Sequence, residues 1–398
     1  MQPVVTSKYE TDGYKLSMGN IFWWLNMIQG KNIQGRYQFF DRNNTIYPEG
    51  FADEANEEIK TLGNLSSNPN VSNYVMQRWP FVNQEFLRWY DQVFFHDYTQ
   101  VDLTQKDGKL RLFVEGPIHT ATHFEIPILR IISTLTTKRL GIIAKPDWQI
   151  EAYNNAKILQ EENVYYSEFG GRRPHSPEVH YEALAQYNKF RKIDGKGGLL
   201  GTSWIQYAYD FGLMIMGTMA HEYVEMMAAL FGYKNANHMA MQTWVDYYGK
   251  RLGYFLTDTY TTDIAFKDFN YKYASIFSGT RQDSGDPKEH ANKQIAHLRS
   301  IDIDPSTKAV VHSNTLKTIP EILDLNTYKI NEYIRSFGLG KFITNNVGNR
   351  GYNTVLKLIG VKEGNEPWKD VVKLSDDPGK SIGNPDEVVH CKSVLGIN

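Results

Sequence analysis

The sequence predicts an α/β protein, in which an irregular barrel of seven to eight parallel strands is joined to an α+β sandwich domain. From about residue 160 onward, short apolar or β-branched runs end in polar or glycine-rich turns and lead into amphipathic helical stretches. This rhythm is typical of repeated βα units, and its spacing suits a parallel barrel. The predicted strand ends lie near Phe169, Gly201, Gly217, Asp258, Gly279, Ser313 and Gly338.

The segments outside the barrel supply the elements of the sandwich. Residues 12–28 have the pattern of a helix, residues 33–42 that of a strand, and residues 109–115 and 118–123 that of a hairpin around Gly116 and Pro117. Residues 352–361 and 371–374 again predict strands, which could rejoin the first domain. We therefore expect a sandwich domain over residues 1–135, a barrel over 136–345, and a C-terminal segment over 346–398 that packs back on the first domain.

Composition and charge narrow the class of protein. The 398 residues are 41% hydrophobic and 22% charged, which is enough apolar surface for the core of a soluble globular protein. A net charge of -2 gives no field that would hold nucleic acid or an anionic membrane. The single cysteine, Cys391, has no assignable role, excludes an intrachain disulfide and suits a reducing cytoplasm. Because no charged segment followed by an apolar stretch opens the chain, we expect neither secretion nor membrane insertion.

The loops that follow the strands of a parallel barrel open on one face, where helix N-termini present bare N–H groups. We expect the chemistry of the protein on that face. The polar and glycine-rich clusters of the sequence fall at the seven predicted strand ends. They read SEFGGRRPHSPE (167–178), GTSW (201–204), MGTMAHE (216–222), LTDT (256–259), GTRQDSGDP (279–287), HSN (312–314) and FGLGK (337–341).

The first cluster places the ring of Phe169 beside Arg172 and Arg173 on a flexible turn. This combination suits stacking on an aromatic ligand together with binding of an anion. The alternative is that Phe169 belongs to the core and that the two arginines are solvated surface residues. Ser176, followed by a proline, predicts the start of a helix.

The cluster GTRQDSGDP combines a guanidinium, two carboxylates, hydroxyls and glycines in nine residues. Arg281 could orient a ring or a phosphate, and Asp283 could hold a sugar diol. Asp258 and Asp283 are the candidate ligands for Mg²⁺, which prefers carboxylate oxygens. Asp286 could instead do no more than cap the next helix.

The glycines of FGLGK allow backbone N–H groups to approach an anion, so Gly338 and Gly340 are candidates for phosphate binding. Ser313 and Asn314, one strand earlier, would add donors beside them. The alternative for the glycine pair is a tight turn without a ligand.

His221 stands at the beginning of a predicted helix, where a histidine can accept a phosphoryl group or assist binding. The alternative is a histidine that is satisfied by Glu222 or by a backbone carbonyl. The histidines lack HExxH or similar spacing, which makes zinc chemistry improbable. The sequence also lacks the GxGxxG, GxxxxGK[ST] and GxSxG motifs, which leaves little support for a dinucleotide oxidoreductase, a P-loop kinase or an α/β-hydrolase.

Taken together, ten ordered motifs closely resemble those of the nicotinate phosphoribosyltransferase family over nearly the whole chain. They are TDGYKLSM (11–18), EGP (115–117), SEFGGRRP (167–174), GTSW, MGTMAHE, LTDTYTT (256–262), GTRQDSGDP, SNTL (313–316), FGLG (337–340) and KLSDDPGK (373–380). The resemblance implies an enzyme of NAD salvage that joins nicotinate to 5-phosphoribosyl 1-pyrophosphate in the presence of Mg²⁺. It also implies coupling of this transfer to ATP hydrolysis through a phosphorylated histidine.

The resemblance assigns roles to individual residues. The phosphohistidine would be His221, acting with Asp283 and Arg281. A homodimer is implied, in which the N-terminal part of one subunit completes the site of the other, so that Tyr14 would stack on the pyridine ring opposite Phe169. The full set of nicotinate contacts would be Tyr14, Phe169, Arg172, Ser203 and Arg281. The contacts to phosphoribosyl or phosphate groups would be Arg42, Arg173, Thr218, Asp258, Ser313, Asn314, Gly338, Gly340 and Lys373.

Three other functions remain as alternatives. Nicotinamide phosphoribosyltransferase is the nearest, because an amide substrate rewards a carboxylate acceptor where a carboxylate substrate rewards donors. The loop around Ser203 contains no acid, which favours nicotinate. Quinolinate phosphoribosyltransferase is disfavoured because a second substrate carboxylate calls for a more basic pocket. Asp258 and Asp283 argue against a barrel that only binds a mononucleotide or a protein partner.

Overall fold

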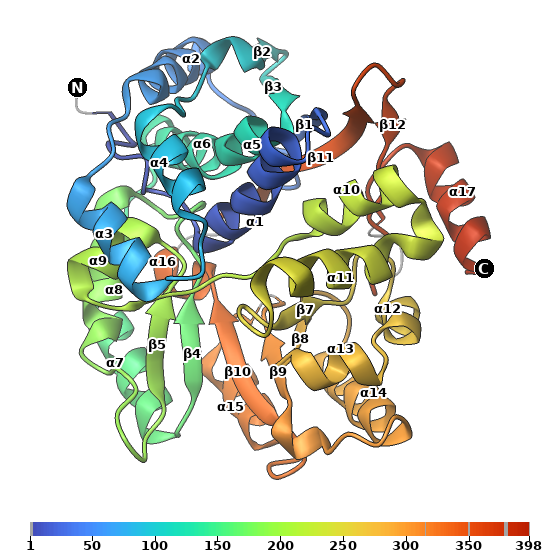
Figure 1. The fold of residues 1–398 in the computed structure, drawn as a ribbon. Coiled ribbons are helices and arrows are strands. Elements are labelled where there is room, and N and C mark those ends of the chain that lie inside the picture. Colours follow the sequence, from blue (N-terminus) through green and yellow to red (C-terminus); the bar gives the residue numbers. More distant parts are fainter. Residues whose placement is uncertain (1–2, 315, 349–350, 378–380, 398) are drawn as a thin grey trace. The chain divides into compact units, whose positions relative to one another are not determined.

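Figure 1 shows the fold of the computed structural model, which describes residues 3–314, 316–348, 351–377 and 381–397. The chain forms two compact units, one of residues 1–217 and 339–357 and the other of residues 218–338 and 358–398. The chain passes from one unit to the other after Gly217, within β10 (Ile334–Leu339) and within β11 (Thr354–Glu363). Thr315, within the motif SNTL, and residues 378–380, at the end of KLSDDPGK, lie outside the described residues.

The first unit contains an antiparallel sheet and a parallel one. Its strands are β1 (Ile33–Asp41), β2 (Val101–Lys106), β3 (Lys109–Pro117), β4 (Tyr165–Glu168), β5 (Gly198–Thr202) and β6 (Met214–Ile215). Strand β3 pairs antiparallel with β1 on one side and with β2 on the other, whereas β4, β5 and β6 pair in parallel. Residues along β1 alternate between buried and half-buried, because one face of its sheet packs on the core.

Helices surround these strands. They are α1 (Gly13–Trp23), α2 (Phe51–Thr61), α3 (Pro69–Arg78), α4 (Gln84–Gln92), α5 (Ile118–Ala121), α6 (Glu125–Arg139), α7 (Trp148–Glu161), α8 (Pro177–Asn188), α9 (Ile205–Phe211) and α16 (Lys341–Thr344). The predicted helix over 12–28 and strand over 33–42 are confirmed, and Ser176 caps α8 by accepting from the backbone N–H of Val179 at 3.2 Å. Every residue of α1 is buried, so this helix is a core element rather than an amphipathic surface helix.

The predicted second strand of the hairpin, residues 118–123, is wrong. The hairpin partner of β3 is the preceding strand β2, and the chain turns into α5 directly after Pro117. Ile118, Ala121 and Phe124 are all fully buried, a three-residue spacing that suits one face of a helix and not the alternating faces of a strand.

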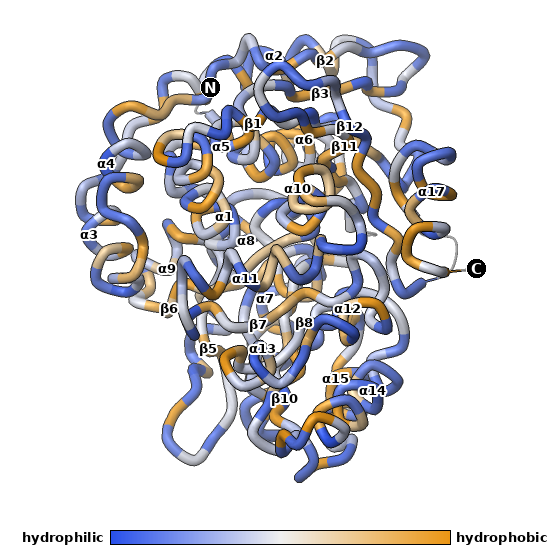
Figure 2. The backbone as a smooth tube through the Cα atoms, turned by 45° about the vertical axis from the view of Figure 1, so that its right-hand side comes forward, coloured by the Kyte–Doolittle hydropathy of each residue, from blue (hydrophilic) through white to orange (hydrophobic). Residues whose placement is uncertain are grey.

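The second unit is built on the parallel order β10-β9-β8-β7, with β7 (Tyr254–Leu256), β8 (Gly279–Gln282) and β9 (Ala309–His312). Its other elements are α10 (His221–Phe231), α11 (Ala236–Tyr248), α12 (Thr262–Asp268), α13 (Tyr271–Ile276), α14 (Pro287–Ser300), α15 (Ile319–Thr327), β12 (Lys369–Asp370) and α17 (Pro385–Leu395). Much of α14 is hydrophilic in Figure 2, while its residues Ala291 and Ile295 form a buried cluster with Val310 of β9. The seven parallel strands and the antiparallel sheet confirm the predicted α/β class.

Two strand boundaries differ from the prediction. Gly279 begins β8 rather than ending it, and it pairs there with Ala309 of the neighbouring strand. A Cβ at this position would lie 1.9 Å from the carbonyl oxygen of Ala309, so the start of the strand requires glycine. The functional loop therefore starts at Asp283. The strand expected over 371–374 is wrong. Strand β12 ends at Asp370, and within 371–374 Lys373 forms an isolated bridge with Ile382. The domain boundaries at residues 135 and 345 stay a prediction.

Within the described ranges, the helices are either too short or too polar for any of them to cross a lipid bilayer.

Candidate active site

Three neighbouring parallel strands of the second unit end in polar side chains. Asp258 lies two residues beyond β7, Asp283 follows β8, and Ser313 follows β9. Because the carboxyl ends of parallel strands meet at one edge of a sheet, these groups are brought together there. The predicted gathering of functional side chains at the strand ends is therefore seen in this unit.

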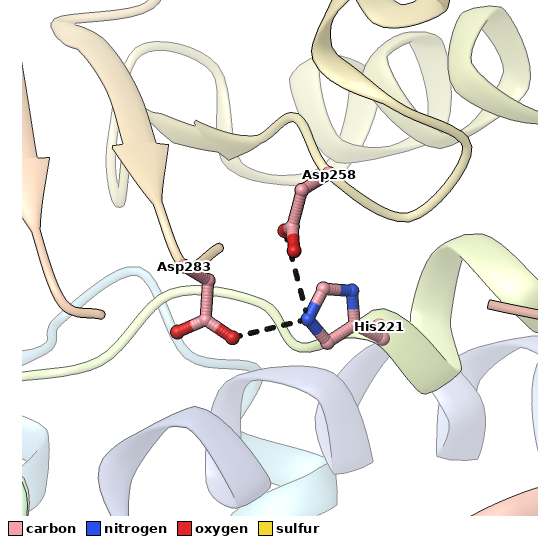
Figure 3. Close-up of side chains that lie close together, drawn as sticks. All are labelled: His221, Asp258 and Asp283. Carbon is pink, nitrogen blue, oxygen red and sulfur yellow. Dashed lines mark hydrogen bonds and ion pairs between the residues drawn. The ribbon is translucent and has the colours of Figure 1, made fainter. Parts of the chain in front are cut away.

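His221, the first residue of α10, lies between the two carboxylates (Figure 3). Its side chain is 4% exposed, and its Nε2 lies 3.2 Å from Oδ2 of Asp283 and 3.7 Å from Oδ1 of Asp258. Nζ of Lys373 lies 2.9 Å from the same Nε2, while Nδ1 lies 3.0 Å from the hydroxyl of Thr259. A neutral ring can accept a hydrogen bond from the ammonium of Lys373 at Nε2, and a protonated ring can instead donate one from Nε2 to Asp283.

Both carboxylates stay ionised in this setting. Burial by itself raises the pKa of Asp258, but the nearby His221 and Lys373 outweigh burial and hold that pKa below its usual range. For Asp283, Arg281 and His221 outweigh desolvation and hold the pKa well below the ordinary value. The ammonium of Lys373 pairs with Oδ2 of Asp258 at 2.8 Å, which places a cation beside the histidine that the resemblance marks for phosphorylation.

The guanidinium of Arg281 is fixed from three sides. It donates to the carbonyl of Met219 at 2.9 Å, to the hydroxyl of Ser313 at 3.1 Å and to Oδ1 of Asp283 at 3.3 Å. Ser313 in turn donates to the same Oδ1 at 2.9 Å. This network holds a planar cation in one orientation, as binding of an anion requires.

Three polar residues of this site were not predicted individually. Besides Thr259, Ser284 donates to Oδ2 of Asp258 at 2.5 Å and accepts from the backbone N–H of Asp376 at 3.0 Å. The carboxylate of Asp376 accepts from the backbone N–H and the hydroxyl of Thr262 at 2.7 and 2.6 Å. All three lie inside quoted motifs, but a pattern that names residue types does not say which of them touch.

The donor set suits a divalent cation. One atom from each of His221, Asp258 and Asp283 lies within 4.8 Å of the others. Oδ1 of Asp258 is buried and, among the described residues, accepts no hydrogen bond, so it is an acceptor suited to a ligand. Two carboxylates match the oxygen preference of Mg²⁺ better than the imidazole does, and Mg²⁺ binding by Asp258 and Asp283 stays a prediction.

The remaining predicted residues of the second unit have simpler surroundings. Nδ2 of Asn314 donates to the carbonyl of Gly285 at 3.2 Å, Thr218 precedes α10 and is half-buried, and Gly338 is a buried residue of β10. The helix-capping alternative for Asp286 is confirmed, because its carboxylate accepts from the backbone N–H of Glu289 at 2.8 Å.

The first unit holds a second charged cluster. Glu125, at the start of α6, accepts from NH1 of Arg172 at 3.0 Å and from Nζ of Lys15 at 2.8 Å. The same NH1 of Arg172 lies 3.2 Å from the hydroxyl of Tyr14. The structure thus brings Tyr14 and Arg172 together within one chain, whereas the resemblance suggested a Tyr14 from the partner subunit.

Ser203 has surroundings that the sequence did not indicate. Its side chain is fully buried, and its hydroxyl donates to Oδ1 of Asp12 at 2.5 Å. Burial raises the pKa of Asp12 to about 7. The loop GTSW contains no acid, but Asp12, which comes from a segment almost 200 residues away in the sequence, brings one beside Ser203.

The other predicted residues of this unit gather around Asn353 and the end of β10. NH1 of Arg173 donates to Oδ1 of Asn353 at 3.4 Å, and the backbone N–H of Arg42 donates to the carbonyl of Asn353 at 3.1 Å. Half-buried Phe169 donates its N–H to the carbonyl of Leu339 at 2.8 Å. The neighbouring Gly340 packs closely on Gly170, since a Cβ added to Gly170 would lie 2.7 Å from the carbonyl oxygen of Gly340.

Glu125 should make the stability of the protein depend on pH. Burial acts to raise its pKa, but Lys15 and Arg172 outweigh burial and lower the pKa from 4.5 to about 2. The native state therefore favours the ionised form, and this contribution is present above pH 4.5 and lost as the pH falls toward 2. We expect Glu125→Gln to lower the free energy of unfolding by about 3 kcal/mol at pH 7 and by less at pH 3. Urea unfolding of both proteins across this range measures it, and a deficit that does not change with pH would contradict it.

The fold is that of an α/β protein, whose second unit holds a candidate site for phosphate-bearing ligands and whose first unit holds a charged cluster of its own. The nicotinate phosphoribosyltransferase (NAPRTase) family matches residues 164–398, and the N-terminal domain of that family matches residues 9–133. The chain belongs to the nicotinate phosphoribosyltransferase family.

Individual relatives agree with this assignment. The chain is 32% identical to nicotinate phosphoribosyltransferase of Desulforapulum autotrophicum over 98% of this chain and 99% of the relative. It is 31% identical to a probable nicotinate phosphoribosyltransferase of Schizosaccharomyces pombe over 99% and 98% of the two chains. The crystal structure of the Porphyromonas gingivalis nicotinate phosphoribosyltransferase superposes with a TM-score of 0.93 at 30% identity, covering 99% of this chain and 100% of that one.

Proposed function

We propose that the chain transfers the phosphoribosyl group of 5-phosphoribosyl 1-pyrophosphate to nicotinate and couples this transfer to ATP hydrolysis through a phosphohistidine at His221. Family membership over almost the whole length supports the transfer reaction. The observation that supports the coupling is the position of His221, buried at a helix N-terminus with Nε2 next to Lys373 and Asp283.

The phosphoryl step requires an unprotonated ring nitrogen. In a neutral imidazole whose Nδ1 proton is donated to Thr259, the lone pair of Nε2 is directed toward Lys373. Attack of this lone pair on the γ-phosphorus of ATP forms the N–P bond as the bond to the ADP oxygen breaks. Lys373 is the cation placed to interact with the transferred group, and hydrolysis of the N–P bond by water later returns the neutral ring. Mg²⁺ held by Asp258 and Asp283 would neutralise charge on the phosphates.

The transferase step depends mainly on positioning. The pyridine nitrogen of nicotinate is already a nucleophile and needs no base, so the task of the protein is to hold the ring in line with the ribose C1 atom. Phe169 and Tyr14 offer aromatic faces, and Arg172 offers a cation for the carboxylate of nicotinate. As the C1–O bond breaks, negative charge grows on the pyrophosphate, and Arg281 is a cation held rigidly enough to stabilise it.

Two further properties belong to the proposal. We infer a homodimer and a cytoplasmic location, the first from the resemblance and the second from a chain with a single, buried cysteine, Cys391. Sedimentation at micromolar concentration tests the oligomeric state.

A direct assay tests the function. The protein is incubated with 5-phosphoribosyl 1-pyrophosphate, Mg²⁺, ATP and either nicotinate or nicotinamide, and pyrophosphate and the mononucleotide product are measured. We expect product with nicotinate and faster turnover when ATP is present. The carboxylate of Asp12 beside Ser203 is the observation that favours nicotinamide, and equal or greater turnover of nicotinamide would support that second function.

A further inference from the structure

We infer that Glu125 is a positioning residue, which holds Arg172 in the orientation that receives the carboxylate of nicotinate. This inference rests on the proposed function, because that function gives Arg172 its ligand. Glu125 lies in none of the sequence motifs, and only its contacts connect it with Arg172.

Glu125 is almost completely enclosed, and each of its oxygens is used by a different cation. Its side chain is 7% exposed, with Oε1 bound to Arg172 at 3.0 Å and Oε2 bound to Lys15 at 2.8 Å. The side chain of Lys15 is fully buried, and its ammonium also lies 3.3 Å from the hydroxyl of Thr122. A buried carboxylate with both oxygens engaged cannot rotate without leaving a buried cation unpaired.

Arg172 is the part of this cluster that a ligand can reach. Its side chain is 27% exposed, whereas the side chains of Lys15 in α1 and Glu125 in α6 are buried. Arg172 lies in the turn between β4 and α8, so the contact with Glu125 joins a loop residue to a helix of the core. The hydroxyl of Tyr14 meets the same NH1 atom at 3.2 Å, which fixes the nitrogen from a second side.

The charges in this cluster leave room for an anion. Lys15 and Arg172 are opposed by the single carboxylate of Glu125, so the three side chains together carry one positive charge in excess. Lys357 also acts on Glu125 and lowers its pKa further. A monoanionic carboxylate bound at Arg172 would balance the excess, and Glu125 would orient the guanidinium without touching the substrate.

Steady-state kinetics with nicotinate as the varied substrate tests the inference. We expect Glu125→Gln to raise the KM for nicotinate about 10- to 100-fold while kcat changes much less, because the ligand site is displaced and the reacting groups are not. Glu54→Gln is the control. Glu54 also pairs with two cations, Lys138 and Arg139, each at 2.9 Å, and none of the three is a predicted ligand contact, so the KM for nicotinate should stay within about threefold of the original.

A double variant separates positioning from a merely structural role. If Glu125 acts through Arg172, then adding Glu125→Gln to Arg172→Lys should raise KM no further than Arg172→Lys alone. If the double variant instead shows the product of the two single increases in KM, the inference is overturned. The same holds if Arg172→Lys raises KM and Glu125→Gln leaves it unchanged. Either result leaves the proposed function intact. An unchanged KM in Arg172→Lys would overturn the role of Arg172 in the proposed function, and the inference with it. Should Glu125→Gln fold poorly, Lys15→Met combined with Glu125→Leu replaces the buried pair by apolar groups and should show the same rise in KM.

Discussion

Replacing His221 by alanine is expected to lower the rate of nicotinate-dependent ATP hydrolysis on the order of 10³-fold or more, while a slow transferase activity remains. The alanine lacks the nitrogen that would accept the phosphoryl group, whereas the predicted nicotinate contacts Tyr14, Phe169 and Arg172 are kept. ATP should then no longer accelerate formation of the mononucleotide. The measurement is ADP release and mononucleotide formation in the same reaction, with and without nicotinate.

Two further variants sharpen this test. His221→Asn keeps a polar side chain at the start of α10 but offers no nucleophilic nitrogen, so it should behave like the alanine variant. His390→Ala changes an exposed histidine of α17 in the same unit and should leave both activities unchanged. Labelling with ATP that carries ³²P in the γ-position should give an acid-labile phosphoprotein only when His221 is present. ATP hydrolysis that persists at its full rate in His221→Ala would refute the phosphohistidine.

The sequence predicts the elements of this fold better than their partners. The βα rhythm after residue 160 appears as parallel strands, because a buried parallel strand is a short apolar run that ends where the chain becomes polar. The misplaced strand over residues 118–123 shows the limit of such reasoning. A short apolar run is compatible with a strand or a helix, and only the packing around Ile118 and Phe124 decides between them.

In the candidate site, too, the positions at the strand ends could be predicted, while the contacts made by distant segments could not. Asp258, Asp283 and Ser313 could be predicted as neighbours because parallel strands place their ends at one edge of the sheet. Asp376 could not, because it reaches Asp258 through Ser284 from a segment that belongs to none of the βα units. Such contacts depend on how a distant segment returns to the strand ends, and periodicity along the chain holds no information about that.

Substrate preference depends on a contact between residues that are distant in the sequence. The loop GTSW contains no acid, yet the hydroxyl of Ser203 is bonded to the carboxylate of Asp12, so an acid is present at the position where it would favour nicotinamide. In this arrangement the hydroxyl of Ser203 donates a hydrogen bond to Oδ1 of Asp12. That oxygen is therefore already used and is less able to accept a hydrogen bond from the amide of nicotinamide. The preference for nicotinate would then depend on the pair and not on Ser203 alone.

Replacing Ser203 by aspartate is therefore expected to shift the ratio of kcat/KM values toward nicotinamide by ~1 to 3 kcal/mol, or about 5- to 150-fold. Two carboxyl groups this close cannot both ionise easily, so the pair should hold one proton and one negative charge near neutral pH. That charge repels the carboxylate of nicotinate and accepts a hydrogen bond from an amide.

Ser203→Asn is the matched control for this substitution, because asparagine has the shape of aspartate without its charge. Ser203 is fully buried, so either side chain must displace its neighbours, and any effect of size alone should appear in both variants. A shift toward nicotinamide that is seen in the aspartate variant and absent from the asparagine variant isolates the charge. The same shift in both, or no shift in either, would mean that the pair of Ser203 and Asp12 does not select between the two pyridines. The selecting charge would then have to come from Arg172, and Glu125→Gln should change the preference in its place.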